Sequence, residues 1–300
     1  MTNPYEADPK EIPATDLYAD VPFMHVNSQT TDSLKYWASV LSLCTRYNRI
    51  YPADDGGRDV FALGSVIVTS SHLHAREGAQ YTEIDFSYAD ANEVRAIALA
   101  KTVLKDVKVP EIYFAGKVLT LAIRYRPQRL TSPQVIGSQV LVQERLPGVG
   151  LSVAWPYLPS DQKRSYKEQA RKILQQLHSI KPTAKLQARS YVVPDPNILS
   201  NGRIHLLEGD ILFSGDNRDL DMSFTHNDFT VSNCIVDNGK ISGLIDWEMA
   251  GFFGWKTAGG VHHRIRTPQR EHFVNANLSK EQLQDMMFWN DLYEEGMPEN

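Results

Sequence analysis

The stretch from residue 224 to 251, FTHNDFTVSNCIVDNGKISGLIDWEMAG, contains three side chains whose types and spacing suit catalysis. Asp228 precedes Asn233 in a loop, and Asp246 ends the β-prone run that follows. A carboxylate such as that of Asp228 can orient a substrate hydroxyl group and accept its proton. An amide oxygen and a carboxylate, from Asn233 and Asp246, are ligands of the kind that Mg²⁺ favours. Together these residues predict a site for metal-assisted phosphoryl transfer.

A β-hairpin is predicted to bring the two metal ligands together. The dipeptide Asn238-Gly239 lies between two β-prone runs, and both central residues of a type I′ turn need positive φ. Pairing by equal steps from this turn places Asn233 opposite Leu244. Because side chains alternate between faces, Asn233, Leu244 and Asp246 are predicted to share one face. Asn233 and Asp246 would then be diagonal neighbours, about 7–8 Å apart at the backbone.

Each of these residues also has a simpler interpretation. Asp and Asn often form turns and cap hairpins, although three of them at this spacing favour a site. His226 is better explained as a hydrogen-bonded scaffold residue than as an acid or base. Glu248 is either a third acid near the metal or an exposed carboxylate. The basic run at 262–266 either contacts a substrate anion or forms a solvated loop, and we favour the loop.

Composition limits the classes of protein that the sequence can represent. The chain has 300 residues, of which 42% are hydrophobic and 22% charged, as in a folded, soluble protein. Its net charge of −5 argues against a general nucleic-acid binder. Cys44 and Cys234 are too few for a disulfide framework and are expected to be buried thiols. The sequence contains neither a signal-peptide core nor an apolar run of about 18 residues, so we expect a cytoplasmic protein that does not span a membrane.

The remaining patterns predict an irregular arm over 1–25 and two lobes, 26–145 and 146–300, joined at Leu146-Pro147-Gly148. In the first lobe the predicted elements are a helix from Thr31, a hairpin of 60–63 and 66–68 around Gly64-Ser65, a helix over 89–104, and strands at 111–115 and 139–143 with a loop over 124–138. In the second lobe they are a helix over 160–180, no clear element over 181–221, the hairpin above and a helical core segment over 286–293. The fold class is therefore α+β, with a small antiparallel sheet in the first lobe.

The sequence resembles the aminoglycoside phosphotransferase and choline kinase-like family, which has the two-lobed protein-kinase-like fold. The matching residues are His226, Asp228 and Asn233 of HNDFTVSN, and Asp246 of IDWEMAG. The resemblance implies that Asp228 is the catalytic base, that Asn233 and Asp246 bind the metal, and that His226 is a structural member of the catalytic loop. The residues of these motifs are most similar to those of a branch of the family that is abundant in filamentous fungi.

The resemblance extends to the nucleotide site, with one departure. Residues 140–148, VLVQERLPG, resemble the last strand of the first lobe and the hinge, which implies a nucleotide contact for Glu144. Glu93 matches a helix glutamate that pairs with a strand lysine in the family, but the lysine position holds Thr69. A hydroxyl group cannot supply the positive charge that lysine brings to phosphate. Either a nearby cation substitutes, or nucleotide binding is weak, or the fold has another use; the nearby cations are His72, His74 and Arg76.

The function predicted from these features is transfer of the γ-phosphoryl group of ATP to a hydroxyl group of a small organic metabolite, with Mg²⁺ as the metal and a role in secondary metabolism. One alternative is a binder or regulator that has lost phosphoryl transfer. Another is an enzyme that uses the cleft for non-phosphoryl chemistry in natural-product biosynthesis. Tyr81, Phe86 and Tyr88 are predicted either to form an aromatic wall for the substrate or to anchor their loop.

Overall fold

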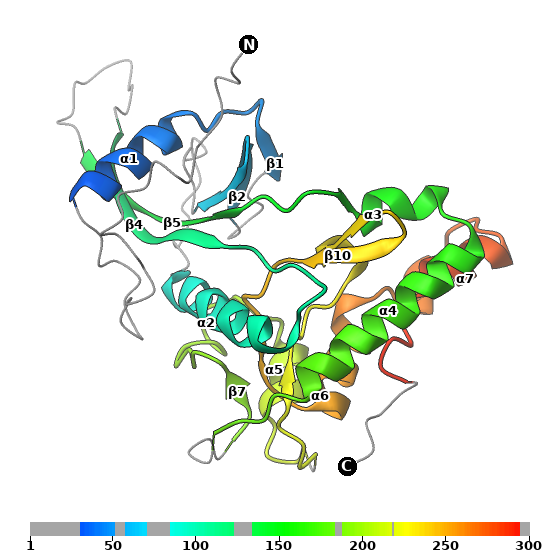
Figure 1. Ribbon diagram of the computed structural model, residues 1–300. Coiled ribbons are helices and arrows are strands. Elements are labelled where there is room, and N and C mark those ends of the chain that lie inside the picture. The colour runs from blue at the N-terminus through cyan, green and yellow to red at the C-terminus, as the bar shows by residue number, and fades with distance from the viewer. Residues whose placement is uncertain are drawn as a thin grey trace. The chain divides into compact units, whose positions relative to one another are not determined.

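The computed structural model describes residues 31–51, 58–70, 85–122, 134–183, 188–217 and 219–294 (Figure 1). The chain divides into two compact units, one formed by Met1–Ala91 with Glu111–Arg145 and the other by Asn92–Pro110 with Leu146–Asn300. The second unit thus includes Asn92–Pro110, which the sequence analysis assigns to the first lobe. The predicted arm over 1–25, the candidate cations at 72, 74 and 76, and Tyr81 lie outside the described residues.

The first unit is built on an antiparallel sheet of five strands in the order β1-β2-β3-β5-β4. Its strands are β1 (Arg49–Tyr51), β2 (Asp59–Leu63), β3 (Val66–Ser70), β4 (Ile112–Ala122) and β5 (Gln134–Glu144). The predicted hairpin of β2 and β3 is confirmed, because Leu63 pairs with Val66 across the turn. Gly64 takes a φ of 57° there, which a residue with a Cβ rarely adopts.

Strands β4 and β5 are longer than the sequence analysis predicts. The loop predicted over 124–138 is wrong from Gln134 onward, because Gln134 pairs with Ala122 and Ser138 with Val118. Pro133 and the glutamines of this stretch favour a loop, but the β-branched residues at 135 and 136 continue the ladder of β5. Each strand therefore pairs over about twice its predicted length.

Helix α1 (Thr31–Ser42) supplies one apolar face to the core of the first unit. Trp37, Val40 and Leu41 are buried, and the Trp37 ring lies 5.8 Å from the ring of Phe114 on β4. Cys44, just after the helix, is a buried free thiol. Helix α2 (Ser87–Val103) begins two residues before its predicted start.

The second unit contains most of the helices and two small sheets (Figure 1). Its helical elements are α3 (Leu151–Ala154), η3 (Trp155–Tyr157), α4 (Ser160–His178), α5 (Leu206–Phe213), η4 (Val231–Asn233), α6 (Trp255–Val261), η5 (His262–Arg266), η6 (Arg270–Phe273) and α7 (Lys280–Met286). One sheet has the order β10-β9-β6, with β6 (Val149–Gly150), β9 (Cys234–Asp237) and β10 (Lys240–Leu244). The other has the order β7-β11-β8, with β7 (Ser190–Tyr191), β8 (Phe224–Thr225) and β11 (Gly251–Phe252). The predicted α+β class is confirmed.

Helix α4 buries the stripe that its sequence predicts, and the members of that stripe are Tyr166, Ala170, Ile173, Leu174 and Leu177. The unassigned region over 181–221 contains β7 and α5. The helix predicted over 286–293 is wrong, because α7 ends at Met286 and turns follow. Trp289, Leu292 and Tyr293 are nevertheless buried, whereas Met286 is exposed. No described helix is both long and apolar enough to cross a membrane.

Candidate active site

The hairpin that carries the site forms at the predicted turn but in a different register. Asn238 and Gly239 have φ values of 47° and 74°, as a type I′ turn requires. The pairing then shifts within β10, so that Leu244 lies opposite Cys234. The prediction that Leu244 lies opposite Asn233 is therefore wrong by one residue.

A β-bulge near Ser242 causes the shift. A Cβ atom on Gly243 would lie 2.6 Å from Leu146 Cδ1 and 3.3 Å from the Ile235 Cβ, so the strand passes its neighbours too closely for a side chain. Ser242 Oγ donates a hydrogen bond to Ile235 O at 3.3 Å. A glycine inside a strand is a recognised sign of a bulge or a close approach, and Gly243 is the sequence feature that signals this one.

The shifted register still brings Asn233 close to Asp246 along the backbone. Ile245 N donates a hydrogen bond to Asn233 O at 3.0 Å, and Asp246 is the next residue. Strand β10 ends at Leu244, so the predicted common face of Asn233, Leu244 and Asp246 does not form, and Leu244 is buried. Asp246 instead takes a φ of 65°, in the left-handed region.

Both carboxylate oxygens of Asp228 are held. Asn233 Nδ2 donates to Asp228 Oδ2 at 3.0 Å and to Asp228 O at 2.8 Å. Arg266 Nε lies 3.1 Å from Asp228 Oδ1. The side chain of Asp228 is 21% exposed, so the carboxylate is fixed but still reached from solvent. Burial raises the pKa of Asp228, although Arg266 and Asn233 act in the opposite direction.

His226 is buried beneath this loop. Its Nε2–H donates to Ile245 O at 3.0 Å, while its Nδ1 accepts from Asp228 N at 3.3 Å. The ring lies 4.5 Å from the ring of Trp247. Burial lowers the pKa of His226 to about 3, so the ring is neutral at pH 7. These contacts tie the loop of Asp228 to the segment that follows β10, which is the scaffold role that the sequence favours.

Asn233 has a free oxygen suited to a metal. Its amide nitrogen donates hydrogen bonds to Asp228, and its Oδ1 accepts no hydrogen bond from any described residue. Within the described part of the chain, no three His, Cys, Asp or Glu side chains gather as a metal cluster. A metal here would thus rely on one amide, one carboxylate and non-protein oxygens, as Mg²⁺ often does.

Glu248 is not an isolated exposed carboxylate. Its side chain is 25% exposed, and its Oε2 lies 4.0 Å from Nη2 of the buried Arg203, which also pairs with Asp195 at 3.4 Å. Asn92 on α2 donates through Nδ2 to the backbone oxygens of Glu248 and Ala250 at 2.8 and 2.9 Å. The segment after Asp246 is therefore fixed by side chains from two distant parts of the second unit.

Two residues of the basic run, Arg266 and His262, do not lie in a solvated loop as predicted. Arg266 lies in the basic run predicted to be a solvated loop, yet its side chain is only 17% exposed and pairs with both Asp228 and Glu208. His262 of the same run is buried, and its Nε2 bonds Trp289 O at 2.9 Å. The predicted solvated loop is therefore wrong: the run forms the π-helical turn η5, in which only His263 and Arg264 are exposed. No local pattern signals Arg266, because both of its acidic partners are distant in sequence.

The comparisons with known proteins decide the family. The model of the phosphotransferase enzyme family matches residues 91–252, more than half of the chain. The chain belongs to the phosphotransferase enzyme family. No curated protein gives a significant match. The predicted fold class, α+β of the protein-kinase-like type, is consistent with this membership.

Several solved phosphotransferase structures are similar at low identity. The streptomycin–ATP–APH(2″)-IIa ternary complex has 12% identity and a TM-score of 0.42, over 81% of this chain and 76% of that one. A thermostable mutant of APH(4)-Ia in its apo form has 14% identity and a TM-score of 0.42, over 82% and 85%. Macrolide 2′-phosphotransferase MphH from Brachybacterium faecium has 13% identity and a TM-score of 0.37, over 83% and 77%.

The residues expected to contact a nucleotide belong to different units. Thr69 on β3 and Glu144 on β5 belong to the first unit, where β3 and β5 pair. Glu144 Oε2 accepts a hydrogen bond from Glu111 N at 3.2 Å. Glu93 lies on α2 among the residues of the second unit and is buried. Of the predicted aromatic wall, Phe86 is buried under the Arg58 guanidinium, 4.6 Å from the ring centre, a contact suited to anchoring.

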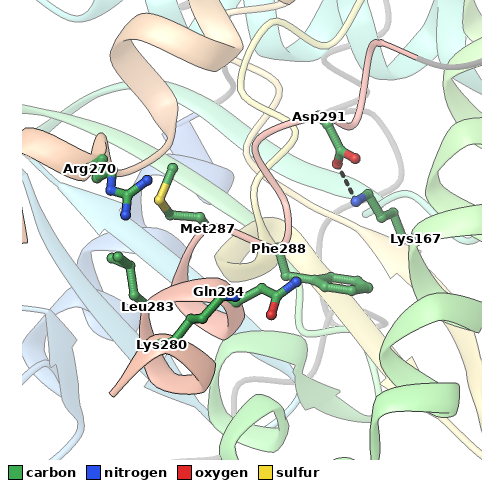
Figure 2. Close-up of a pocket in the computed structure, with 8 residues that line it drawn as sticks. All are labelled: Lys167, Arg270, Lys280, Leu283, Gln284, Met287, Phe288 and Asp291. Carbon is green, nitrogen blue, oxygen red and sulfur yellow. Dashed lines mark ion pairs between the residues drawn. The ribbon is translucent and has the colours of Figure 1, made fainter. Parts of the chain in front are cut away.

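The C-terminal segment contacts the loop that contains Asp228. Trp289 Nε1 donates to Phe229 O, next to Asp228, at 3.0 Å. A pocket of 460 Å³ lies between α4 and α7 (Figure 2), and its lining residues are Lys167, Arg270, Lys280, Leu283, Gln284, Met287, Phe288 and Asp291. Within it Lys167 pairs with Asp291 and lies 4.4 Å from the centre of the Phe288 ring. None of the predicted site residues lines this pocket, and its ion pair fastens the C-terminal segment to α4.

Proposed function

We propose that this phosphotransferase moves the γ-phosphoryl group of ATP to a hydroxyl group of a small organic metabolite. The observation that supports this most directly is the geometry of Asp228, whose two carboxylate oxygens are held by Asn233 and Arg266. Asp228 and Asn233 follow the buried His226 in the pattern that the sequence analysis associates with a catalytic loop. Phosphoryl transfer requires little covalent chemistry from the protein, so positioned charges of this kind account for most of the catalysis.

In this proposal Asp228 orients the acceptor hydroxyl and takes its proton. Asn233 donates a hydrogen bond to Asp228 Oδ2 and Arg266 forms an ion pair with Oδ1, so each oxygen has one side-chain partner and keeps a lone pair for the substrate. A pKa raised by burial brings the carboxylate closer to the operating pH, which makes it a better base than a solvated aspartate. The partial exposure of Asp228 gives an acceptor access to it.

Asn233 and Asp246 would hold Mg²⁺. The oxygen of Asn233 fits this role because its amide nitrogen is already engaged by Asp228. Asp246 follows the residue whose backbone pairs with Asn233, so both ligands come from one short hairpin. When bound, the metal neutralises charge on the nucleotide phosphates. Glu248 remains a candidate third acid, restrained by Arg203.

The alternative of a binder or regulator is favoured by Thr69, which supplies no positive charge at the position where the family has lysine. The proposed nucleotide contacts of Thr69, Glu93 and Glu144 remain predictions, as do the fungal branch and the role in secondary metabolism. Against the alternative stands the arrangement around Asp228, since a binder has no physical need for a carboxylate fixed at both oxygens.

The proposal is tested by thermal unfolding with ATP and Mg²⁺, followed by transfer of labelled γ-phosphate to a panel of hydroxylated metabolites. A ligand at a hundred times its Kd raises the unfolding free energy by about 2.7 kcal/mol. Asp246→Asn, which tolerates the positive φ of this position, should weaken the Mg²⁺-dependent part of that increase. Asp228→Asn should bind nucleotide like the wild type and lose transfer. No stabilisation at millimolar nucleotide would favour the binder or the non-phosphoryl enzyme instead.

A further inference from the structure

Arg266 joins the candidate base to a second, fully buried acid. Its Nε lies 3.1 Å from Asp228 Oδ1 and donates to Asn227 O at 3.3 Å, while its Nη2 pairs with Glu208 Oε1. The guanidinium therefore contacts both the catalytic loop and α5. A lysine could not reproduce this arrangement, because its single nitrogen lacks the two separated donors of the guanidinium fork.

Glu208 accounts for the position of Arg266. Its side chain is 1% exposed, and it makes no other ion pair with the described residues. Burial raises the pKa of Glu208, while Arg266 lowers it. A buried carboxylate without a partner is strongly unfavourable, so Glu208 and Arg266 hold each other in place. The ion pair with Glu208 therefore fixes the guanidinium group that contacts Asp228.

The backbone on both sides of the contact is unusual. Arg266 is the last residue of η5, a π-helical turn, and π turns are rare and occur mostly at functional sites. Thr267 Oγ1 donates to the carbonyl oxygens of His262 and His263 at 3.1 and 3.2 Å, so two carbonyl groups of this turn have a hydrogen-bond donor. Opposite it, Asn227 takes a φ of 60° and offers its carbonyl oxygen to Arg266. Such conformations persist where the surrounding structure requires them.

We infer that Arg266 is a positioning residue for the base, and that Glu208 anchors it. Arg266 holds one oxygen of the Asp228 carboxylate while Asn233 holds the other, so the plane of the carboxylate is fixed before an acceptor binds. The inference rests on the proposed function, because Asp228 is a base only if the chain transfers phosphoryl groups. Loss of Arg266 should thus reduce kcat far more than it affects nucleotide binding.

The activity test uses phosphate release from ATP with water as the acceptor. Arg266→Lys keeps the positive charge but loses the two separated donors of the guanidinium group, so the Asp228 carboxylate should shift. A shift of about 1 Å at a reacting group lowers kcat by about 100-fold. Arg266→Met is combined with Glu208→Gln, so that no unpaired buried charge remains to prevent folding. The control is Arg171→Met. Arg171 is similarly buried, at 15% exposed, and its Nε and Nη2 donate to Leu292 O and Asp291 O at 3.3 and 3.0 Å.

We expect both Arg266 variants to lose kcat with a nearly unchanged KM for ATP, and the Arg171 variant to retain kcat. Partial recovery of the Met/Gln double variant by added guanidinium ions would further support the role. Equal kcat losses in the Arg266 and Arg171 variants would mean that Arg266 acts only through stability, and the inference would be overturned.

A second measurement does not depend on activity. In ¹⁵N-labelled protein the Nε–H resonance of Arg266 should exchange slowly with solvent and should shift in Asp228→Asn, whereas that of Arg171 should not shift. A rapidly exchanging Arg266 resonance that is insensitive to Asp228→Asn overturns the inference whatever the activity. If the contact is present but the wild type releases no phosphate and phosphorylates no acceptor, the proposed function fails while the contact between Arg266 and Asp228 stands.

Discussion

Replacing Asp221 should destabilise the segment that leads into β8 and the loop of the proposed base, Asp228. The carboxylate of Asp221 accepts hydrogen bonds from Trp255 N at 2.9 Å, Ser223 N at 2.9 Å, Ser223 Oγ at 2.8 Å and His178 Nε2 at 2.8 Å. These donors belong to the start of α6, the approach to β8 and the end of α4. One side chain therefore ties together three elements that support the site.

The expected loss follows from these bonds. In Asp221→Ala, at least two backbone N–H groups lose their acceptor, and each such loss costs about 1–3 kcal/mol. The side chain of Asp221 is 23% exposed, so water replaces part of the loss, and we expect about 3 kcal/mol. Asp221→Asn keeps one acceptor oxygen and the shape of the side chain, so it should cost less, about 1.5 kcal/mol, as for one bond to a charged group.

The pH dependence gives this prediction a definite sign. Burial opposes ionisation, but the hydrogen bonds from Trp255, Ser223 and His178 lower the pKa of Asp221 well below its ordinary value. A lowered folded-state pKa gives stability that is present above the unfolded pKa of about 3.9 and is lost as the pH falls through the folded value. The stability difference between the wild type and Asp221→Asn should therefore be constant from pH 7 to about 5 and shrink below about 4.

Urea unfolding followed by tryptophan fluorescence measures the difference, with the exposed Asp216→Asn as the control. Surface substitutions away from such networks usually change the unfolding free energy by less than about 0.5 kcal/mol. A difference of that size for Asp221→Ala, or a difference for Asp221→Asn that grows as the pH falls, would refute the reasoning.

Three further predictions concern close packing and burial. Gly243→Ala should destabilise the protein by about 1–3 kcal/mol in urea unfolding, because its Cβ would lie 2.6 Å from Leu146 Cδ1; an unchanged midpoint would show that the bulge has room. Trp289→Phe should cost at least about 1–2 kcal/mol by the same method, since Phe229 O loses its indole donor; a neutral effect would contradict this. Burial raises the pKa of Cys44 to about 12 and raises that of Cys234 above its ordinary value. A thiol reagent at pH 8 should therefore modify neither cysteine until the protein unfolds. Reaction of either cysteine in the native protein would contradict this prediction.

Much of the fold could be predicted from local patterns. The turn at Gly64-Ser65, the turn at Asn238-Gly239 and the buried stripe of α4 all depend on residues close in sequence, and they form as expected. The bulge in β10 was missed, although Gly243 inside the strand is a sequence feature that indicates one. Helix α5 was missed because its eight residues, LLEGDILF, show no helical period and bury a glutamate, Glu208.

The same distinction applies to the site. Asp228, Asn233 and Asp246 lie within one short stretch whose spacing carries the prediction. Arg266 and Glu208 could not be found in this way, because only the folded second unit places an arginine from a π-helical turn against an acid on α5. A basic run in a sequence is usually solvated, and long-range contacts override that expectation for His262 and Arg266.

Backbone strain provides an independent indication of where the function lies. Among the described residues, three that are not glycine have positive φ: Asn227, Asn238 and Asp246. Asn238 belongs to the hairpin turn, where the strain has a structural reason. The other two are the neighbour of the proposed base and a proposed metal ligand. Local preference alone would favour other conformations at both positions, and sequences usually depart from such preferences where a site requires it. The positive φ angles thus fall on one residue of the motif, Asp246, and on the neighbour of another, Asp228, which is evidence that the sequence does not contain.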